Sequence, residues 1–460
     1  MSAHKTLLSL LLVSLLSGCA TNVEKAPHSL LIPEAWRNQV GPASTVEANW
    51  WQAFGDPLLN QLVEQALRNN PDILIARARV DQYRAQLRGA EGDNFPTLNA
   101  GVAATRTRAM SPATGQPMQT SVFQGLLQAN YDVDLWGARS SSIDAAKASL
   151  EAQQAAASAA ELTIASSVAS GYMTLTALDE QLRVTQATLR TRQDSLKLAQ
   201  RQFETGYTSK LEWVQSESEY QTAKAQIPLL QHQITQQENA LSILVGMNPR
   251  QIARQNHFAH MMPQTLPTVM PSELLQRRPD IVQAERQLLA ADDSLKASRA
   301  KLLPSLNLTA SGTLQSSILH DLVSDPFRLW SIGGSILAPI LNREALTAQV
   351  DASMAARNQA LYGYEKVVRN AFSEVNNDLD AIARYRQQLE ELETQQQVVS
   401  EALRIATNRY QNGYASYLEE LDAQRTLFST QLSVVQAKNN LLLAQIDLYR
   451  ALGGGWQKQP

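Results

Sequence analysis

The chain contains two copies of one sequence pattern. The motif PDI at residues 71–73 returns 208 positions later at residues 279–281, and the residues around it also correspond. Further on, the segment FETGYTSKLEW, which begins at Phe203, returns as YQNGYASYLEE, which begins at Tyr410. A duplication of about 200 residues predicts two similar halves that line one object, which is more typical of walls and channels than of catalytic sites.

The N-terminus reads as the signal peptide of a lipoprotein. Lys5 precedes an apolar run at residues 7–16, which is too short to span a bilayer. The run leads into LSGC at residues 16–19, which resembles the bacterial lipobox, in which the cysteine is acylated and becomes the new N-terminus. Because Cys19 is the only cysteine, the sequence predicts no disulfide. Ala20 stands where Asp would retain a lipoprotein in the inner membrane, so the resemblance implies sorting to the outer membrane.

Four short segments alternate with the period of two that is typical of β-strands. In the first of them, Leu98, Ala100 and Val102 share one face, while Thr97 and Asn99 share the other. The expected strands cover about residues 96–107, 122–135, 304–315 and 329–340. Such strands fit a transmembrane β-barrel, although a soluble sheet packed on a core would alternate in the same way. We also expect the two hairpins to pair only between copies of the chain.

Most of the remaining sequence predicts long helices with heptad seams. The segment 139–204 contains no proline and carries apolar residues at spacings of three and four, as does 343–411. At about 1.5 Å per residue each would extend roughly 100 Å. The shorter helices expected are 50–68, 72–93, 209–246 (interrupted by Pro228), 279–301 and 416–452. In each half two of the short helices together match the long one, so we expect them to stack end to end alongside it.

These expectations divide the chain into six parts. They are a signal peptide (1–18), a lipidated arm (19–49), a first structural repeat (50–256), a linker (257–271), a second structural repeat (272–452) and a C-terminal tail (453–460). Four strands cannot close a barrel, and open strand edges are not tolerated in lipid. Three copies would supply twelve strands and twelve lines of helix, enough for a pore that continues into a hollow shaft.

Five motifs in this order resemble the TolC-type outer-membrane efflux factors, in particular their lipoprotein (NodT-like) branch. The motifs are the lipobox at Cys19, WWQAFGDPL at residues 50–58, YDVDLWG at residues 131–137, RPDI at residues 278–281 and ALGGGW at residues 451–456. The resemblance covers nearly the whole mature chain. It implies an α+β membrane protein, a homotrimer in which long antiparallel coiled-coil helices form a periplasmic α-barrel and four strands per chain form a shared transmembrane β-barrel. It also implies docking on an inner-membrane pump through a periplasmic adaptor.

The same resemblance assigns roles to the two repeated turns. Gly206-Tyr207 and Gly413-Tyr414 each join a long helix to a returning one, and they would form the periplasmic tip where the adaptor docks. A tyrosine before the second turn and acidic residues after it would line the gate, and here these are Tyr410, Glu419 and Asp422. A plain helical-hairpin turn followed by solvated carboxylates is the simpler interpretation of the same residues.

The sequence excludes several other functions. It contains no P-loop, HExxH or GxSxG motif, and the net charge of −3 comes without a basic stripe, so we expect neither an enzyme nor a nucleic-acid-binding protein. We expect no cofactor. The soft ligands His257, His260, Met261 and Met262 could bind Cu(I), but a solvated linker explains them better.

The expected function is therefore a passive exit duct in the outer membrane for a tripartite pump that exports drugs or other small toxic amphiphiles. Type I protein secretion would use a duct of the same geometry, and a periplasmic coiled-coil scaffold without a pore is the alternative from another class.

Overall fold

The computed structural model describes residues 31–37, 46–255, 258, 261 and 269–456. Cys19, His257, His260 and Met262 lie outside these ranges. The residues from Pro33 onward form one compact unit, separate from Met1–Ile32, and the description below concerns that unit.

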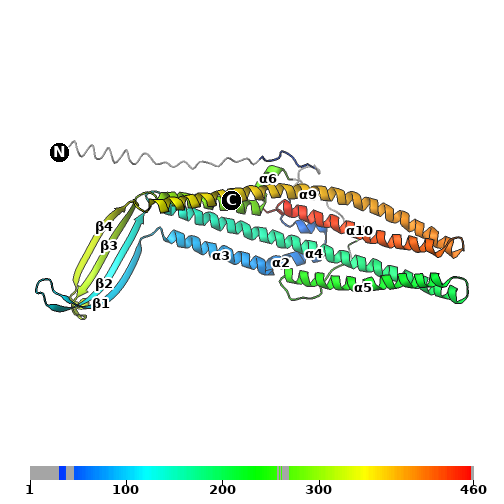
Figure 1. The fold of residues 1–460 in the computed structure, drawn as a ribbon, viewed down its shortest axis with the longest axis horizontal. Helices are drawn as coiled ribbons and strands as arrows, with labels where there is room; N and C mark the ends of the chain where they lie inside the picture. Colours follow the sequence, from blue (N-terminus) through cyan, green and yellow to red (C-terminus); the bar gives the residue numbers. More distant parts are fainter. Residues whose placement is uncertain (1–30, 38–45, 256–257, 259–260, 262–268, 457–460) are drawn as a thin grey trace. The chain divides into compact units, whose positions relative to one another are not determined.

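Two long helices and four shorter ones make up most of this unit (Figure 1). The long ones are α4 (Ala138–Glu204) and α9 (Arg343–Gln411), and both lack proline. The shorter ones are α3 (Pro71–Gly92), α5 (Lys210–Leu244), α7 (Pro279–Ala300) and α10 (Tyr417–Ala451). All six lie close to the ranges expected from the heptad seams. No described helix combines the length and the hydropathy that crossing a membrane requires.

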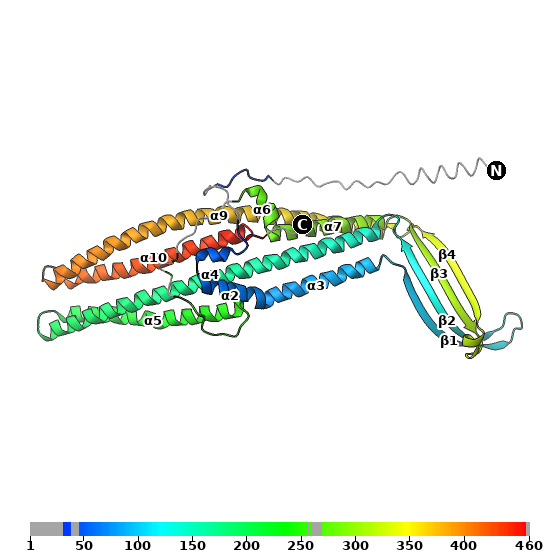
Figure 2. The ribbon, with the colours of Figure 1, turned by 180° about the vertical axis from the view of Figure 1, so that it is seen from behind.

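The helices lie side by side in one layer, and their contacts give the order of neighbours across it. The short helices α3 and α5 both pack on α4, which in turn contacts α7 and α10, and these two pack on α9 (Figure 2). Across the layer, the first line of helix consists of α3 and α5, the second of α4, the third of α7 and α10, and the fourth of α9. The short helices therefore follow one another along the long ones, as their lengths predicted.

The strands form a single antiparallel sheet in the order β1-β2-β3-β4. They are β1 (Thr97–Met110), β2 (Pro117–Val133), β3 (Ser305–Ser316) and β4 (Phe327–Leu337). The hairpins join through β2 and β3, where Phe123 lies opposite Ser316 and Val133 opposite Leu306. The expectation that the hairpins pair only between copies was therefore wrong, because the neighbouring helices α4 and α7 bring β2 and β3 together within one chain. Within the sheet only the outer edges of β1 and β4 lack a neighbouring strand.

Polar side chains on the sheet pair across neighbouring strands. Ser311 and Ser331 hydroxyls lie 2.8 Å apart, and the Gln124 amide donates to Gln315 Oε1 at 3.0 Å. Many apolar side chains of the sheet are exposed in the single chain, for example Val102 by 88% and Trp330 by 79%. A sheet that leaves such side chains uncovered needs an apolar medium or a partner against them.

Three local features differ from the sequence-based expectations. The helix expected at 50–68 is two elements, a 3₁₀ helix η1 (Trp50–Phe54) and α2 (Pro57–Asn69). Gly55 adopts φ 72° between them, and the Asp56 carboxylate caps α2 by accepting from the backbone N–H of Leu58. By contrast, α5 continues through Pro228 without interruption. Two short helices, α6 (Pro271–Arg277) and α8 (Asp321–Ser324), were not expected.

The main core lies along the middle of α4, under η1 and α2. The Tyr172 hydroxyl of α4 donates to Asp56 Oδ2 at 2.6 Å, and burial followed by the charge of Asp56 raises the pKa of this phenol. The Trp50 ring stacks on Tyr449 of α10 with centroids 5.2 Å apart. These contacts explain the WWQAFGDPL motif: its aromatic residues and Asp56 join the start of the fold to α4 and α10.

Candidate functional site

Two turns with matching backbone geometry, which we call the tip turns, end the long helices. Gly206 (φ 77°) follows α4 and Gly413 (φ 78°) follows α9, and a left-handed conformation of this kind ends a helix without strain only at glycine. The next residue in each turn, Tyr207 or Tyr414, donates its backbone N–H to a carbonyl of the preceding helix at 2.8 Å. Both tyrosine side chains are exposed. All four expected docking residues thus lie in two accessible turns.

Tyr410 connects the second helical hairpin to the first. Its hydroxyl donates to Gln202 Oε1 of α4 at 2.9 Å and lies 3.4 Å from Glu212 Oε2 of α5. Burial raises the pKa of Tyr410, and the charge of Glu212 raises it further, so the phenol remains a donor. Of the three expected gate residues, this is the one that forms hydrogen bonds between α9 and the α4–α5 hairpin.

The two acidic gate residues are placed differently. Glu419 at the start of α10 forms an exposed ion pair with Arg409 of α9, at 3.4 Å. Asp422 lies one turn further along α10, where its side chain is exposed and Arg425 is a charged neighbour. Within one chain, Tyr410, Glu419 and Asp422 therefore do not form a single cluster.

A buried ion cluster near the tip turns was missed by the sequence analysis. Glu219 of α5 lies 3.0 Å from the Arg192 guanidinium of α4 and 2.5 Å from that of Arg425 on α10. The side chains of Arg192 and Glu219 are only 4% and 8% exposed. Arg192 also lies over the Phe428 ring, 5.2 Å from its centroid. The cluster joins α4 and α5 to α10, as Tyr410 joins them to α9.

A signal for this cluster was present in the sequence. Arg192 lies three residues after Leu189 and four before Leu196, at an apolar position of the α4 seam. Arg425 lies four residues after Leu421 and three before Phe428, at an apolar position of the α10 seam. A charged residue within a heptad seam predicts a buried partner, because an unpaired charge there would be costly. The position of the partner, Glu219, could not be inferred from spacing.

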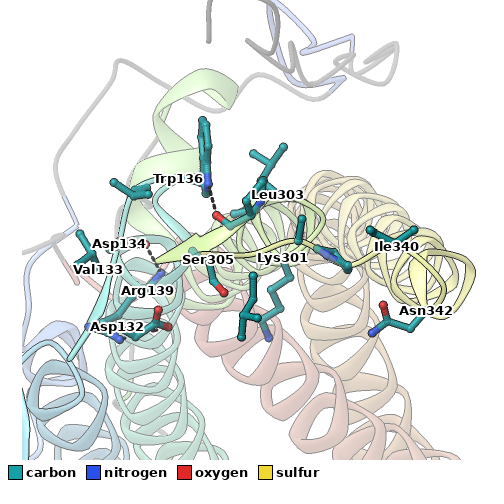
Figure 3. A pocket seen from close by; sticks show the side chains of 17 residues that line it. Asp132, Val133, Asp134, Trp136, Arg139, Lys301, Leu303, Ser305, Ile340 and Asn342 are labelled. Atoms are coloured by element: carbon teal, nitrogen blue, oxygen red, sulfur yellow. Dashed lines mark hydrogen bonds and ion pairs between the residues drawn. The ribbon is translucent and has the colours of Figure 1, made fainter. Parts of the chain in front are cut away.

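The junction between sheet and helices contains the YDVDLWG motif (Figure 3). The Asp134 carboxylate accepts from the backbone N–H groups of Arg139 and Ser140 at 3.0 and 2.9 Å, which satisfies the first turn of α4. The Trp136 indole donates to Pro304 O at 2.7 Å, where α7 passes into β3. A cavity of about 540 Å³ lies beside these residues, with Arg139 and Lys301 in its wall. The motif therefore fixes how β2 turns into α4 and how the two hairpins are held together.

The RPDI motif joins three helices through one arginine. Arg278 binds both carboxylate oxygens of Asp280 at 3.0 and 2.7 Å, Glu374 of α9 at 2.7 Å and the carbonyl of Ala451 at 3.1 Å. The glycines of ALGGGW lie against this region: a Cβ on Gly453 would stand 2.1 Å from the carbonyl oxygen of Arg277. The RPDI and ALGGGW motifs, which lie far apart in the sequence, therefore form one structural unit.

An acidic pair lies near this unit. Burial raises the pKa of Asp378 on α9 to about 7, and the charge of Asp447 on α10 adds to the shift. The described residues contain no group of three or more His, Cys, Asp or Glu side chains that could hold a metal ion. Of the four soft side chains that were interpreted as part of a solvated linker, the structure describes only Met261, which is buried rather than solvated.

Comparison with known proteins places these features in one family. The family model described as outer membrane efflux protein matches residues 62–247 and 270–454. The pyoverdine export outer membrane protein OpmQ of Pseudomonas aeruginosa is 34% identical over 454 residues, 96% of this chain and 95% of that protein. The probable outer membrane lipoprotein SilC of Salmonella typhimurium is 29% identical and covers 98% of each chain.

Solved channels have the same fold. The structure of the outer-membrane channel OprN superimposes with a TM-score of 0.86 at 25% identity, over 94% of this chain and 100% of that one. The open state of the Neisseria gonorrhoeae MtrE outer membrane channel gives 0.84 at 28% identity, over 95% and 98%. These relatives are efflux and channel proteins rather than enzymes. The chain therefore belongs to the outer membrane efflux protein family, as an outer-membrane exit duct of a tripartite efflux pump.

Proposed function

We propose that three copies of the chain close head to tail into one continuous duct. The observation that supports this is that the sheet and the helical layer are open at corresponding edges. One edge consists of β1 with α3 and α5, and the other of β4 with α9. Both edges carry exposed apolar side chains. They include Leu74, Ile75 and Ile243 on the first edge, and Tyr362, Val398 and Ile405 on the second.

Three-fold closure would satisfy both edges at once. Each β4 would pair with the β1 of the next copy, which gives three times four strands and a transmembrane β-barrel without free edges. Each α9 would pack on the neighbouring α3 and α5, which completes a periplasmic α-barrel of twelve helix lines. In this arrangement each sequence repeat contributes two strands and two helix lines, which accounts for the internal duplication.

The cargo we propose is drugs or other small toxic amphiphiles. Relatives of similar identity are named for antibiotic efflux (ArpC) and toluene efflux (TtgC), both from Pseudomonas putida. These names favour small-molecule export over type I protein secretion. Because the duct contains no energy-converting motif, an inner-membrane pump would drive transport, and a periplasmic adaptor would reach the duct at Tyr207, Tyr414 and the glycines beside them.

The gate we propose opens by separating the α9–α10 hairpin from the α4–α5 hairpin. Tyr410 and the Glu219–Arg425 ion pair both hold the two hairpins together near the tip turns. Three copies of exposed Asp422 would meet around the axis, with Glu419 beside them. Like charges held at one level attract cations and repel one another, so this ring would favour cation passage.

Single-channel conductance of the purified protein in planar bilayers tests the proposal. Tyr410→Ala should raise the resting conductance about two-fold or more, because each of the three copies loses the hydrogen bond that holds its two hairpins together. Asp422→Ala should lower cation selectivity without comparable opening. Glu401→Ala, which removes an exposed carboxylate elsewhere on α9, is the matched control and should change neither property.

Two results would contradict parts of this account. Absence of channels in the unmodified protein would remove the duct and favour a scaffold. Channels that keep the original conductance and selectivity in both the Tyr410 and Asp422 variants would place the gate elsewhere along α10.

A further inference from the structure

A cavity of about 320 Å³ lies inside the wall, between α4, α9 and α10. Its lining consists of Thr191, Asp194, Ser195 and Leu198 of α4, Leu403, Thr407, Tyr410 and Gln411 of α9, and Tyr417, Glu420 and Gln424 of α10. It lies between helices of one chain, whereas the exposed Asp422 lies on the surface of α10. The cavity is therefore distinct from the proposed ring of Asp422 side chains.

The two acids in the wall of this cavity differ in their surroundings: Asp194 is paired with Lys197, outside the lining, at 3.3 Å, whereas Glu420 has neutral partners. Of the eleven described residues that line it, two are acidic, Asp194 and Glu420, and none is Lys, Arg or His. Glu420 is only 7% exposed. A carboxylate buried to this degree without a cation is costly, because desolvation is not compensated by an opposite charge.

Glu420 differs in its partners from the other buried glutamates of the described residues. Glu219, Glu238 and Glu365 each form an ion pair with an arginine. Glu420 receives hydrogen bonds from two neutral groups, the Thr407 hydroxyl at 3.1 Å and the Gln424 amide at 3.2 Å. Both donors reach Oε1, which leaves Oε2 open to a ligand.

Two aromatic rings complete the wall. Tyr410 and Tyr417 have centroids 5.5 Å apart with their planes tilted by 57°, and both belong to the lining. Ring faces attract cations through their quadrupole, and a desolvated cation gains more from them than a solvated one. A carboxylate combined with two tyrosine rings is a suitable environment for an ammonium group.

We propose that this cavity is a binding site for a small organic ammonium ion, held by the Glu420 carboxylate and the faces of Tyr410 and Tyr417. An inorganic cation fits the site less well, because it would find one buried carboxylate where metal sites provide several hard ligands. An organic cation uses the volume and the rings as well as the charge. The site involves α4, α9 and α10 of a single chain, so it does not depend on closure of the duct.

Binding of tetramethylammonium to the purified full-length protein in detergent tests this site. Saturation-transfer NMR titrations at constant ionic strength, balanced with sodium chloride, give the dissociation constant. Glu420→Gln preserves shape and removes the charge, so we expect binding to weaken by at least about tenfold. Tyr417→Leu should weaken binding by about three- to tenfold. The matched control Glu401→Gln, on the exposed face of α9, should bind like the unmodified protein.

A further variant separates the cavity from the duct axis. Asp422→Asn should weaken only cations held at the proposed axial ring and leave the affinity of the cavity site unchanged, because the Asp422 side chain does not line the cavity. Loss of binding in Asp422→Asn but not in Glu420→Gln would assign the ion to the acidic ring and overturn the proposal. No measurable binding to the unmodified protein, or equal competition by sodium, would also overturn it. Melting curves of each variant show whether the fold is retained, and Tyr417→Leu provides an independent readout if Glu420→Gln alters folding.

Discussion

Two arginines, Arg192 and Arg425, occupy positions that the heptad pattern reserves for apolar residues, and both pair with Glu219. Arg192 and Glu219 are buried and paired, and Arg425 completes the cluster from α10. Such a cluster contributes little net stability compared with apolar packing, but the loss of one member leaves the others uncompensated. The cluster instead orients the helices, since it determines which face of α10 meets the α4–α5 hairpin.

Removal of the shared acid should therefore be severe. We expect Glu219→Ala to lower the free energy of unfolding by about 3–5 kcal/mol, because Arg192 would remain buried without its carboxylate. Chemical denaturation followed by circular dichroism measures the change. Glu401→Ala breaks the exposed pair with Arg404 and should have no measurable effect. Equal stabilities of the two variants would show that the buried cluster is not energetically coupled.

Asp378 should make stability depend on pH. Its pKa is raised to about 7 in the folded protein by burial and by Asp447, above its ordinary value. Between the ordinary pKa of an aspartate and about 7, the folded chain binds a proton that the unfolded chain releases. The contribution of Asp378 to stability is therefore largest in acid, is lost as pH rises through about 7, and changes no further above that pH.

Asp378→Asn should remove this dependence. The variant should match the original protein near pH 4 and exceed it by about 2 kcal/mol at pH 8. Thermal or denaturant unfolding at both pH values provides the measurement. The control Asp380→Asn, on the exposed side of α9, should not flatten the profile. If the dependence of stability on pH were the same in Asp378→Asn as in the original protein, the raised pKa assigned to Asp378 would be wrong.

At the scale of elements, one glycine permits the contact between α4 and α5. A Cβ on Gly171 would lie 2.9 Å from Leu241 Cδ2 and 3.0 Å from Gln237 Nε2. We expect Gly171→Leu to destabilise the protein by about 1–3 kcal/mol through overpacking. Gly363→Leu in α9, where nothing lies within 4 Å, should instead stabilise by about 0.5–1 kcal/mol. If Gly171→Leu and Gly363→Leu shifted the melting temperature by the same amount and in the same direction, close packing at Gly171 would not be the cause.

The two faces of the sheet should respond differently to charge. Val102→Asp, Leu308→Asp and Val133→Asp place a carboxylate on the face we expect to meet lipid. Each should cost about 2–4 kcal/mol or less according to depth. Thr105→Asp, on the opposite face of β1, should be tolerated. The yield of protein assembled in the outer membrane measures the effect, and full yield from all three apolar-face variants would argue against a lipid-facing sheet.

At the scale of the whole molecule, the expected lipid anchor can be tested separately from the duct. Cys19→Ser should abolish acylation, because only the thiol accepts the lipid, while the folded unit should still assemble. Mass spectrometry of the mature protein is the measurement. An unmodified N-terminus at a residue other than Cys19 in the original protein would refute the lipoprotein assignment.

Local patterns predicted the elements well. The heptad seams of α4 and α9 and the alternation of the four strands depend on residues a few positions apart, so they can be read directly from the chain. The tip turns were likewise predictable, because Gly206 and Gly413 each mark a helix end. The break at Gly55 was missed although the local signals for it were present, a glycine followed by a capping aspartate and a proline. The continuity through Pro228 was misjudged because packing of α5 on α4 outweighs the local cost of a proline.

What the sequence by itself determined is therefore the six main helices, the four strands and the two tip turns, with their approximate lengths, and, through five ordered motifs, the family. The tertiary structure alone decided which faces meet: β2 with β3 inside one chain, Glu219 with Arg425, Tyr410 with Gln202, and Asp56 with Tyr172. The physical reason is that periodicity identifies the buried face of an element but not its partner. The partner depends on contacts between residues hundreds of positions apart, which form only when the whole layer is assembled.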